Sequence, residues 1–193
     1  SDRQQFDDPH RLAERVGISS ATWSLFGQVW PSGRVLAQAL SRIDIGQRRV
    51  LEVGCGLGLS SLLLRSRGAD VLATDHHPLA EHFLIDNARR NGILPVPYRD
   101  FPWVERLPSL GRFDLIVGSD VLYERGHAEL LSALVDRHAR HNAQVLITDP
   151  GRGNSAPFST AMRGQGFTLE EARAAFDDRD VPPFRGRLLS YAR

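Results

Sequence analysis

The stretch from Arg49 to Asp75 constrains the fold more than any other part of the chain. It reads RVLEVGCGLGLSSLLLRSRGADVLATD and opens with a short apolar, β-branched run at Val50–Val53. Three glycines follow at alternate positions, then an apolar helical pattern that ends at Gly68, and a second apolar run that leads to Asp75. This order of strand, glycine turn, helix and strand predicts half of a doubly wound α/β sheet, with its ligand at the carboxyl ends of the strands.

The spacing of the glycines argues against a bound dinucleotide. A dinucleotide turn has the pattern G-x-G-x-x-G, but Gly54, Gly56 and Gly58 are evenly spaced and Leu59 stands where the third glycine would be needed. Glycines allow the backbone to pass close beneath a ligand, where a Cβ would collide. The alternative is that they serve only a tight turn from strand to helix.

Two acids flank the glycines. Glu52 lies two residues before the first glycine, and Asp75 ends the next strand. An acid followed by G-x-G-x-G resembles the first motif of the class I, seven-strand S-adenosylmethionine-dependent methyltransferases. The resemblance implies that Glu52 binds the amino group of the methionine moiety and that Asp75 accepts hydrogen bonds from the ribose hydroxyls. The S-adenosylmethionine-binding residues expected here are Glu52, Gly54, Cys55, Gly56, Gly58 and Asp75.

Composition limits the kind of protein. A chain of 193 residues predicts one domain, in which residues 1–45 form a helical or lid segment and residues 46–193 form the methyltransferase domain. A net charge of +1 does not favour nucleic acid or a membrane as a partner. No apolar run approaches the ~20 residues that a membrane span requires, and we expect no signal peptide. The single cysteine, Cys55, suits a reducing cytoplasm. We expect a cytoplasmic monomer.

An aromatic residue precedes the glycine motif. The string Val29-Trp30-Pro31-Ser32-Gly33 comes just before a helical pattern. Trp30 would pack over the cofactor as a lid or lie in the core or at its edge. A W-P-x-[GA] segment about twenty residues ahead of the glycines resembles the protein-lysine methyltransferases of methyltransferase family 16, in which it lies close to the cofactor.

The residues that follow the second and third predicted strands suit an adenine. His76 comes directly after the ribose acid, and Asp100 follows a strand expected at Leu94–Tyr98, which Pro95 and Pro97 assign to a sheet edge. The Asp100 carboxylate would accept from the exocyclic amine, and Phe101 or Trp103 would line the ring unless either is a core residue. No metal is expected, because the seven histidines show no ligand pattern.

A second focus is FDLIVGSDVLY at residues 113–123. Its strand neighbours the first strand across the switch point, so that Ser119 and Asp120 would face the methyl group. The tetrad from Asp120 to Tyr123 resembles the D-x-x-Y motif of methyltransferase family 16, which implies catalytic roles for these two residues; otherwise Asp120 would cap a helix and Tyr123 would pack. Amino-methylating nucleic-acid enzymes carry N/D-P-P-Y/F there, whereas this chain has Val121-Leu122.

The remaining chain completes a Rossmann-like α/β fold. We expect seven strands, mostly parallel with the last antiparallel, and helices on both faces. The string Asp149-Pro150-Gly151-Arg152 resembles the family branch that methylates an electron-transfer flavoprotein subunit, and Arg152 would meet an acidic substrate or pair with a neighbouring acid. Strands are expected at Phe167–Phe176 and Arg187–Tyr191.

The resemblance predicts an S-adenosylmethionine-dependent N-methyltransferase that acts on a lysine of a protein. All 24 basic residues of the chain are arginines, so such an enzyme would have no lysine of its own to modify. One alternative is a small-molecule methyltransferase of the nicotinamide type. Another is a non-catalytic module that binds the cofactor and a partner.

Overall fold

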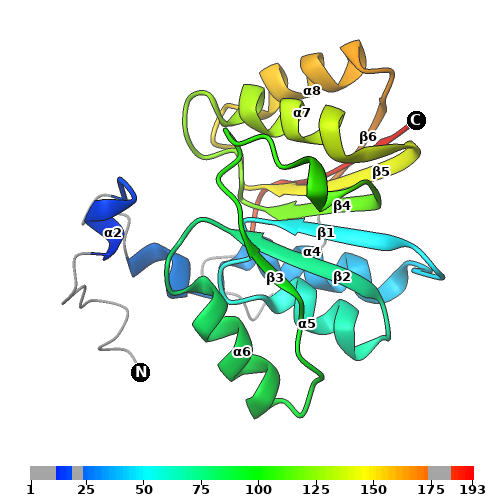
Figure 1. The fold of residues 1–193 in the computed structure, drawn as a ribbon. Coiled ribbons are helices and arrows are strands. Elements are labelled where there is room, and N and C mark those ends of the chain that lie inside the picture. Colours follow the sequence, from blue (N-terminus) through cyan, green and yellow to red (C-terminus); the bar gives the residue numbers. More distant parts are fainter. Residues whose placement is uncertain (1–11, 19–23, 174–183) are drawn as a thin grey trace.

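The computed structural model describes residues 12–18, 24–173 and 184–193. Within these residues, seven strands form one sheet with helices on both faces (Figure 1). The strands are β1 (Arg49–Val53), β2 (Asp70–Asp75), β3 (Tyr98–Asp100), β4 (Phe113–Ser119), β5 (Ala139–Asp149), β6 (Thr168–Arg173) and β7 (Arg187–Ala192). The helices are α2 (Leu12–Arg15), α4 (Pro31–Arg42), α5 (Leu59–Ser66), α6 (Ala80–Arg90), α7 (His127–His138) and α8 (Ser155–Gly164), with short 3₁₀ turns η1 (Ser24–Gly27) and η2 (Pro108–Leu110).

The sheet has the strand order β3-β2-β1-β4-β5-β7-β6. The five strands from β3 to β5 are parallel, whereas β7 lies between β5 and β6 and is antiparallel to both. The predicted doubly wound sheet and its antiparallel last strand are therefore confirmed. Because β1 pairs with β2 on one side and β4 on the other, the glycine loop after β1 and the Asp120 loop after β4 lie at the same switch point.

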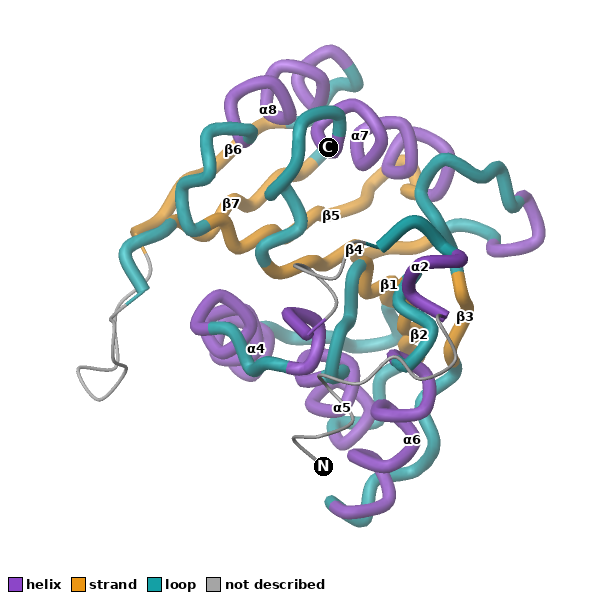
Figure 2. The backbone as a smooth tube through the Cα atoms, turned by 90° about the vertical axis from the view of Figure 1, so that its left-hand side faces the viewer, coloured by secondary structure: helices purple, strands orange, loops and turns teal. Residues whose placement is uncertain are grey.

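Two apolar cores lie on opposite faces of the sheet. Figures 1 and 2 show α4, α5 and α6 on one face of the sheet and α7 and α8 on the other. On one face, α4, α5 and α6 pack with Leu36 and Leu40 fully buried; on the other, α7 and α8 cover a core that contains Phe158 and Tyr191. These last two rings meet edge to face with centroids 5.3 Å apart. Helix α4 contributes Leu36 and Leu40 to the same core as strands β1 and β2.

The third strand differs from its expected position. It was expected at Leu94–Tyr98 and lies at Tyr98–Asp100, although it is at the sheet edge as predicted. Pro95 and Pro97 have no N–H to donate, so regular pairing begins only after them, while the Pro97 carbonyl still accepts from Ala73 N at 2.9 Å. Residues 174–176, the end of the strand predicted to start at Phe167, lie outside the described residues.

Neither a membrane-spanning helix nor a cluster of metal-ligating side chains is found in residues 12–18, 24–173 and 184–193. No helix there is long and apolar enough to span a membrane. No group of three or more His, Cys, Asp and Glu side chains in those same residues is arranged to hold a metal ion.

Candidate cofactor and acceptor site

Asp75 is the best-anchored acid at the carboxyl end of the sheet. Its Oδ2 accepts from Gly56 N at 2.8 Å, and its Oδ1 accepts from His76 N at 2.7 Å and His77 N at 2.8 Å. Burial raises the pKa of this carboxyl, and the three N–H donors counteract the rise. Asp75 thus joins the end of β2 to the glycine loop after β1, and one of its roughly four acceptor positions is left for a hydroxyl.

Glu52 of β1 is directed toward helix α5. Its side chain is buried, and its Oε2 accepts hydrogen bonds from both the backbone N–H and the hydroxyl of Ser61, near the start of α5. Burial raises the pKa of Glu52 to about 7, while the bonds to Ser61 oppose the rise. The Glu52 carboxylate ties β1 to α5, because the first turn of that helix offers free N–H groups. Its binding of the S-adenosylmethionine ammonium stays a prediction from the family resemblance.

Glu52→Gln is expected to remove a pH-dependent cost to stability. The folded chain keeps a proton on Glu52 up to about pH 7, whereas the ordinary value for the unfolded chain is 4.5. Because the pKa of Glu52 is raised in the folded chain, the proton on Glu52 contributes folding stability that is complete below pH 4.5 and is lost as the pH rises to about 7. The variant, which has no charge to bury, should gain about 2–3 kcal/mol of unfolding free energy relative to wild type between pH 5 and pH 8. Urea unfolding across this range measures the difference.

The control for this expectation is Glu81→Gln, which changes an exposed acid of α6. Its difference from wild type should stay flat with pH. A flat difference for Glu52→Gln would show that Glu52 titrates normally in the folded chain.

The three glycines are required by the backbone and by the protein's own packing. Gly54, Gly56 and Gly58 all have positive φ, at 63°, 51° and 79°. A Cβ on Gly56 would lie 3.2 Å from the Phe26 carbonyl oxygen, and one on Gly58 would overlap Leu84. Their neighbour Cys55 packs its side chain into the core, where burial raises the pKa of the thiol. Its expected contact with the cofactor is therefore limited to the backbone.

The residues expected around an adenine are only partly brought together. His76 Nδ1 and Asp100 Oδ1 lie 3.5 Å apart, both on exposed side chains at the ends of β2 and β3. The half-buried Trp103 ring approaches Gly54, where an added Cβ would lie 3.9 Å from the ring. Phe101 is different: its ring is fully buried and meets His138 edge to face, so it is a core residue and presents no surface to a ligand.

The segment before α4 lies against the glycine loop. Trp30, at the N-terminal end of α4, donates from Nε1 to the Leu25 carbonyl at 3.0 Å, which ties this helix to η1. Phe26 of η1 stacks on His77 with ring centroids 3.6 Å apart. The sequence pointed to Trp30 in this segment but not to Phe26, because a single aromatic in a loop carries no periodic signal.

The four residues of the D-x-x-Y tetrad differ in their exposure to solvent. Val121 and Leu122 are buried in the core, whereas Tyr123 is 52% exposed. Asp120 has φ 53°, and among the described residues it is the one non-glycine with positive φ; its N–H donates to the Thr148 carbonyl at 2.8 Å. Such a conformation costs energy and is concentrated at functional sites. The N-cap of α7 is Gly126, so Asp120 does not cap that helix. Ser119, which precedes Asp120, lies near Gly33 of α4.

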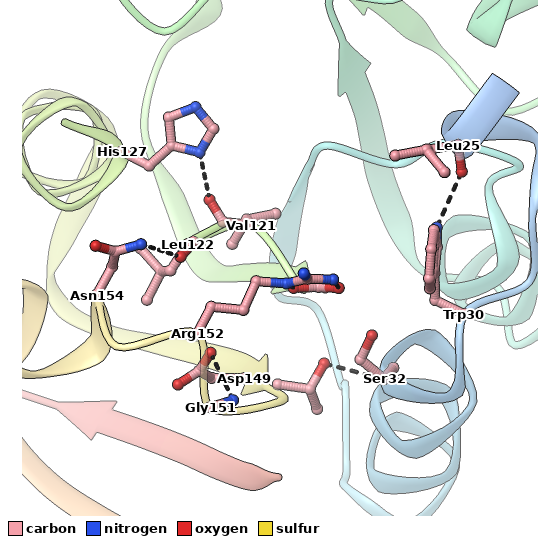
Figure 3. A network of polar contacts seen from close by, with 12 residues as sticks. Leu25, Trp30, Ser32, Val121, Leu122, His127, Asp149, Gly151, Arg152 and Asn154 are labelled. Atoms are coloured by element: carbon pink, nitrogen blue, oxygen red, sulfur yellow. Dashed lines mark hydrogen bonds and ion pairs between the residues drawn. The ribbon is translucent and has the colours of Figure 1, made fainter. Parts of the chain in front are cut away.

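Two residues outside the tetrad contact it. His127, at the start of α7, donates from Nδ1 to the Val121 carbonyl at 3.1 Å, because a carbonyl oxygen can only accept a hydrogen bond. Its ring lies edge-on to Trp103 and to Tyr123, with centroids 5.2 Å and 4.6 Å away. Arg152 extends from the loop after β5 (Figure 3) and donates to the Asp120 carboxylate. Sequence reasoning missed His127 and left the partner of Arg152 open.

Comparison with known proteins agrees with this geometry. The model of a family described as lysine methyltransferase matches residues 15–160, which include the glycine loop, the D-x-x-Y tetrad and Arg152. The chain belongs to this family. The resemblance to methyltransferase family 16 inferred from Trp30, the glycines and Asp120 is thereby confirmed.

Several curated relatives fit this family. The chain is 30% identical to the mouse electron transfer flavoprotein beta subunit lysine methyltransferase over 79% of the chain and 59% of that protein. It is 39% identical to the Xenopus laevis histone-arginine methyltransferase METTL23 over 63% and 55%, and 30% identical to the zebrafish protein N-lysine methyltransferase METTL21A over 89% and 78%. The chain therefore spans less than two thirds of the first two relatives.

Solved structures support the fold alone. A magnesium protoporphyrin IX methyltransferase from Synechocystis with bound S-adenosylmethionine superposes with a TM-score of 0.66 at 17% identity, covering 100% of this chain and 97% of that one. A ribosomal protein L11 methylase from Lactobacillus delbrueckii gives a TM-score of 0.63 at 23% identity, with 84% and 78% coverage. The seven-strand methyltransferase fold is therefore shared with enzymes that differ widely in sequence.

Proposed function

We propose that this protein is an S-adenosylmethionine-dependent N-methyltransferase that methylates a lysine side chain of a protein. One observation carries the proposal: Asp120 and the exposed Tyr123 stand at the end of β4, directly beside the glycine loop of the adjacent β1. Family membership and the lysine methyltransferases among the relatives support it. A reducing, cytoplasmic location remains our expectation from the single buried thiol.

The residues at this end of the sheet fit S-adenosylmethionine. Asp75 offers the remaining acceptor position of its anchored carboxylate to a ribose hydroxyl, and the exposed side chains of Asp100 and His76 offer polar atoms to an adenine edge. When bound, S-adenosylmethionine supplies a methyl carbon whose bond to the positively charged sulfur breaks, with the electron pair left on sulfur, as the acceptor nitrogen bonds to it. The protein's own task is then to place the acceptor nitrogen in line with that bond.

Asp120 and Tyr123 suit the acceptor side of the reaction. A lysine amine in water is mostly protonated at pH 7 and must lose its proton before its lone pair is free. The Asp120 carboxylate can receive the ammonium by a charge-assisted hydrogen bond, and the exposed Tyr123 ring offers a face to a cation. Burial, and next the Glu124 carboxylate, raise the pKa of Tyr123, so its phenol remains protonated and is not the base.

The test is transfer of a tritiated methyl group. The protein is incubated with labelled S-adenosylmethionine and a lysate of cells that lack its gene, and in parallel with a purified electron transfer flavoprotein beta subunit and with histones. A labelled protein whose hydrolysate contains methyllysine supports the proposal. Methylarginine or methylhistidine in the hydrolysate would identify arginine or histidine, and not lysine, as the acceptor. Label confined to small molecules would favour the nicotinamide-type alternative. Binding of the cofactor without any transfer would identify a non-catalytic module.

Asp75→Asn is expected to weaken the binding of S-adenosylmethionine about 10-fold or more, as measured by isothermal titration. Asparagine has one acceptor oxygen instead of two, and its amide nitrogen would face N–H donors at Gly56 or at His76 and His77. The matched control is Asp70→Asn, which alters an exposed acid at the other end of the same strand. Equal affinities for the two variants would remove Asp75 from the cofactor site.

A further inference from the structure

Arg152 holds both oxygens of the acceptor-side carboxylate. Its Nε donates to Asp120 Oδ1 and its Nη2 donates to Asp120 Oδ2, each at 2.6 Å. The Asp120 side chain is 10% exposed and that of Arg152 is 43% exposed, so the carboxylate lies inside and the guanidinium covers it from the solvent side. The hydrogen bond to Asp120 also raises the pKa of Arg152. A two-pronged pair of this kind fixes the plane of the carboxylate as well as its position.

The loop that carries Arg152 is anchored at both ends. Before it, the buried Asp149 accepts from Gly151 N at 3.2 Å. After it, Asn154 Nδ2 donates to the Leu122 carbonyl at 2.8 Å, which joins this loop to the D-x-x-Y tetrad (Figure 3). Gly151 and Gly153 on either side of Arg152 have φ 95° and 90°, a turn that other residues rarely adopt. The geometry presents Arg152 to Asp120 and is not that of a freely swinging side chain.

We propose that Arg152 is a positioning residue for the methyl acceptor, which orients the Asp120 carboxylate and favours the uncharged form of the incoming amine. The inference rests on the proposed function, since it assumes an amine acceptor at Asp120. It assigns to Arg152 a role at the reaction centre and excludes a contact made only with a distant acidic part of the substrate.

The hydrogen-bond capacity of Asp120 and the charge of Arg152 together give Arg152 this role. A carboxylate offers about four acceptor positions, of which the guanidinium takes two, so the amine can still donate to Asp120. The Asp120–Arg152 pair has no net charge, and a nearby positive charge disfavours a protonated amine. The ammonium therefore gives up its proton to solvent more readily, and the nitrogen lone pair that is released forms the new bond to the methyl carbon. The protein gains a more reactive nucleophile without a separate base.

Other titratable groups near Arg152 set the background for a pH measurement. They are Asp120 and Tyr123 of the β4 loop, Asp149 at the end of β5, and Glu124 and His127 beside Tyr123. Variants at Arg152 leave all five in place. A change in the pH profile that follows the charge at position 152 can therefore be assigned to Arg152.

The experiment compares Arg152→Met and Arg152→Lys with wild type on the acceptor identified in the lysate. For Arg152→Met we expect kcat at pH 7 to fall about 10- to 100-fold, with the acid limb of the kcat profile about one pH unit higher and the affinity for S-adenosylmethionine unchanged. Arg152→Lys keeps the positive charge but cannot make the two parallel hydrogen bonds to Asp120. The acid limb of its kcat profile should therefore stay near that of wild type while kcat falls. Arg163→Met, which changes an exposed arginine of α8, should match wild type in every measurement.

A readout that needs no catalysis accompanies the kinetics. The Nε–H of Arg152 should give a slowly exchanging nitrogen-15 signal in the free protein, assigned by its loss in Arg152→Lys; a rapidly exchanging signal would overturn the proposal. A rise in kcat or a lower KM in Arg152→Met would show that Arg152 obstructs the acceptor, and an unmoved acid limb would also overturn the proposal. A wild-type protein that labels no acceptor contradicts the proposed function itself, and the Arg152 proposal falls with it.

Discussion

Replacing Asp120 with asparagine is expected to slow methyl transfer to the acceptor protein about 100-fold or more and to leave the affinity for S-adenosylmethionine unchanged. Asparagine keeps the size of the side chain and tolerates positive φ, so the backbone at 53° can persist. The variant loses the negative charge that receives the ammonium. It also leaves the Arg152 guanidinium with one amide oxygen as acceptor in place of two carboxylate oxygens. Single-turnover transfer of a tritiated methyl group measures the rate, and isothermal titration measures the affinity.

Asp136→Asn provides the control for this rate, since Asp136 is an exposed acid on α7. It should retain the wild-type rate. Full turnover by Asp120→Asn, with unaltered cofactor binding, would show that Asp120 does not position the acceptor. Loss of cofactor binding in the same variant would place Asp120 in the cofactor site instead.

Gly58→Ala is expected to destabilise the fold by about 2–5 kcal/mol, a large part of the total stability of a domain. The residue has φ 79°, which costs an L-residue about 1–2 kcal/mol. In addition, the new methyl group would overlap the Leu84 side chain, which is 1% exposed in the core between the sheet and α6. Overpacking of this kind adds about 1–3 kcal/mol. Urea denaturation monitored by tryptophan fluorescence gives the free energy of unfolding.

Gly68→Ala separates the two contributions. Gly68 has φ 78°, and an added Cβ would meet nothing within 4 Å. Its expected cost is therefore the backbone part alone, about 1–2 kcal/mol. Equal losses for the two variants would mean that Leu84 moves aside and that the glycine is needed at Gly58 only for its backbone conformation.

The order of the strands and helices could be predicted from the sequence because each element carries a local pattern of residues. The apolar run at Val50–Val53 and the alternate glycines predict a strand and a tight turn by themselves, and both are found. The position of β3 was wrong by several residues because the apolar residues around Pro95 and Pro97 resemble a strand, yet two missing N–H groups prevent regular pairing. A pattern of side chains shows where apolar residues lie, but pairing depends on the backbone donors.

The candidate site was readable to a different degree for each residue. Asp75 and Asp120 were expected at the ends of strands whose order follows from the doubly wound pattern, and the structure places both at that edge of the sheet. Glu52 and Phe101 were expected to face a ligand but are turned into the protein, the first toward Ser61 and the second into the core. The direction of a side chain near the end of a strand depends on which residues pack beside it, and those residues come from other parts of the sequence.

The sequence by itself determined the parallel sheet, the left-handed glycine turn and the acids at the strand ends, because these depend on spacing within a few residues. The tertiary structure alone decided that β7 inserts between β5 and β6, that Glu52 is buried against α5, and that Arg152 covers Asp120. Each of these is a contact between distant segments, and its geometry depends on how the whole sheet twists and packs. The Asp120–Arg152 pair joins residues 32 positions apart, which no local pattern encodes.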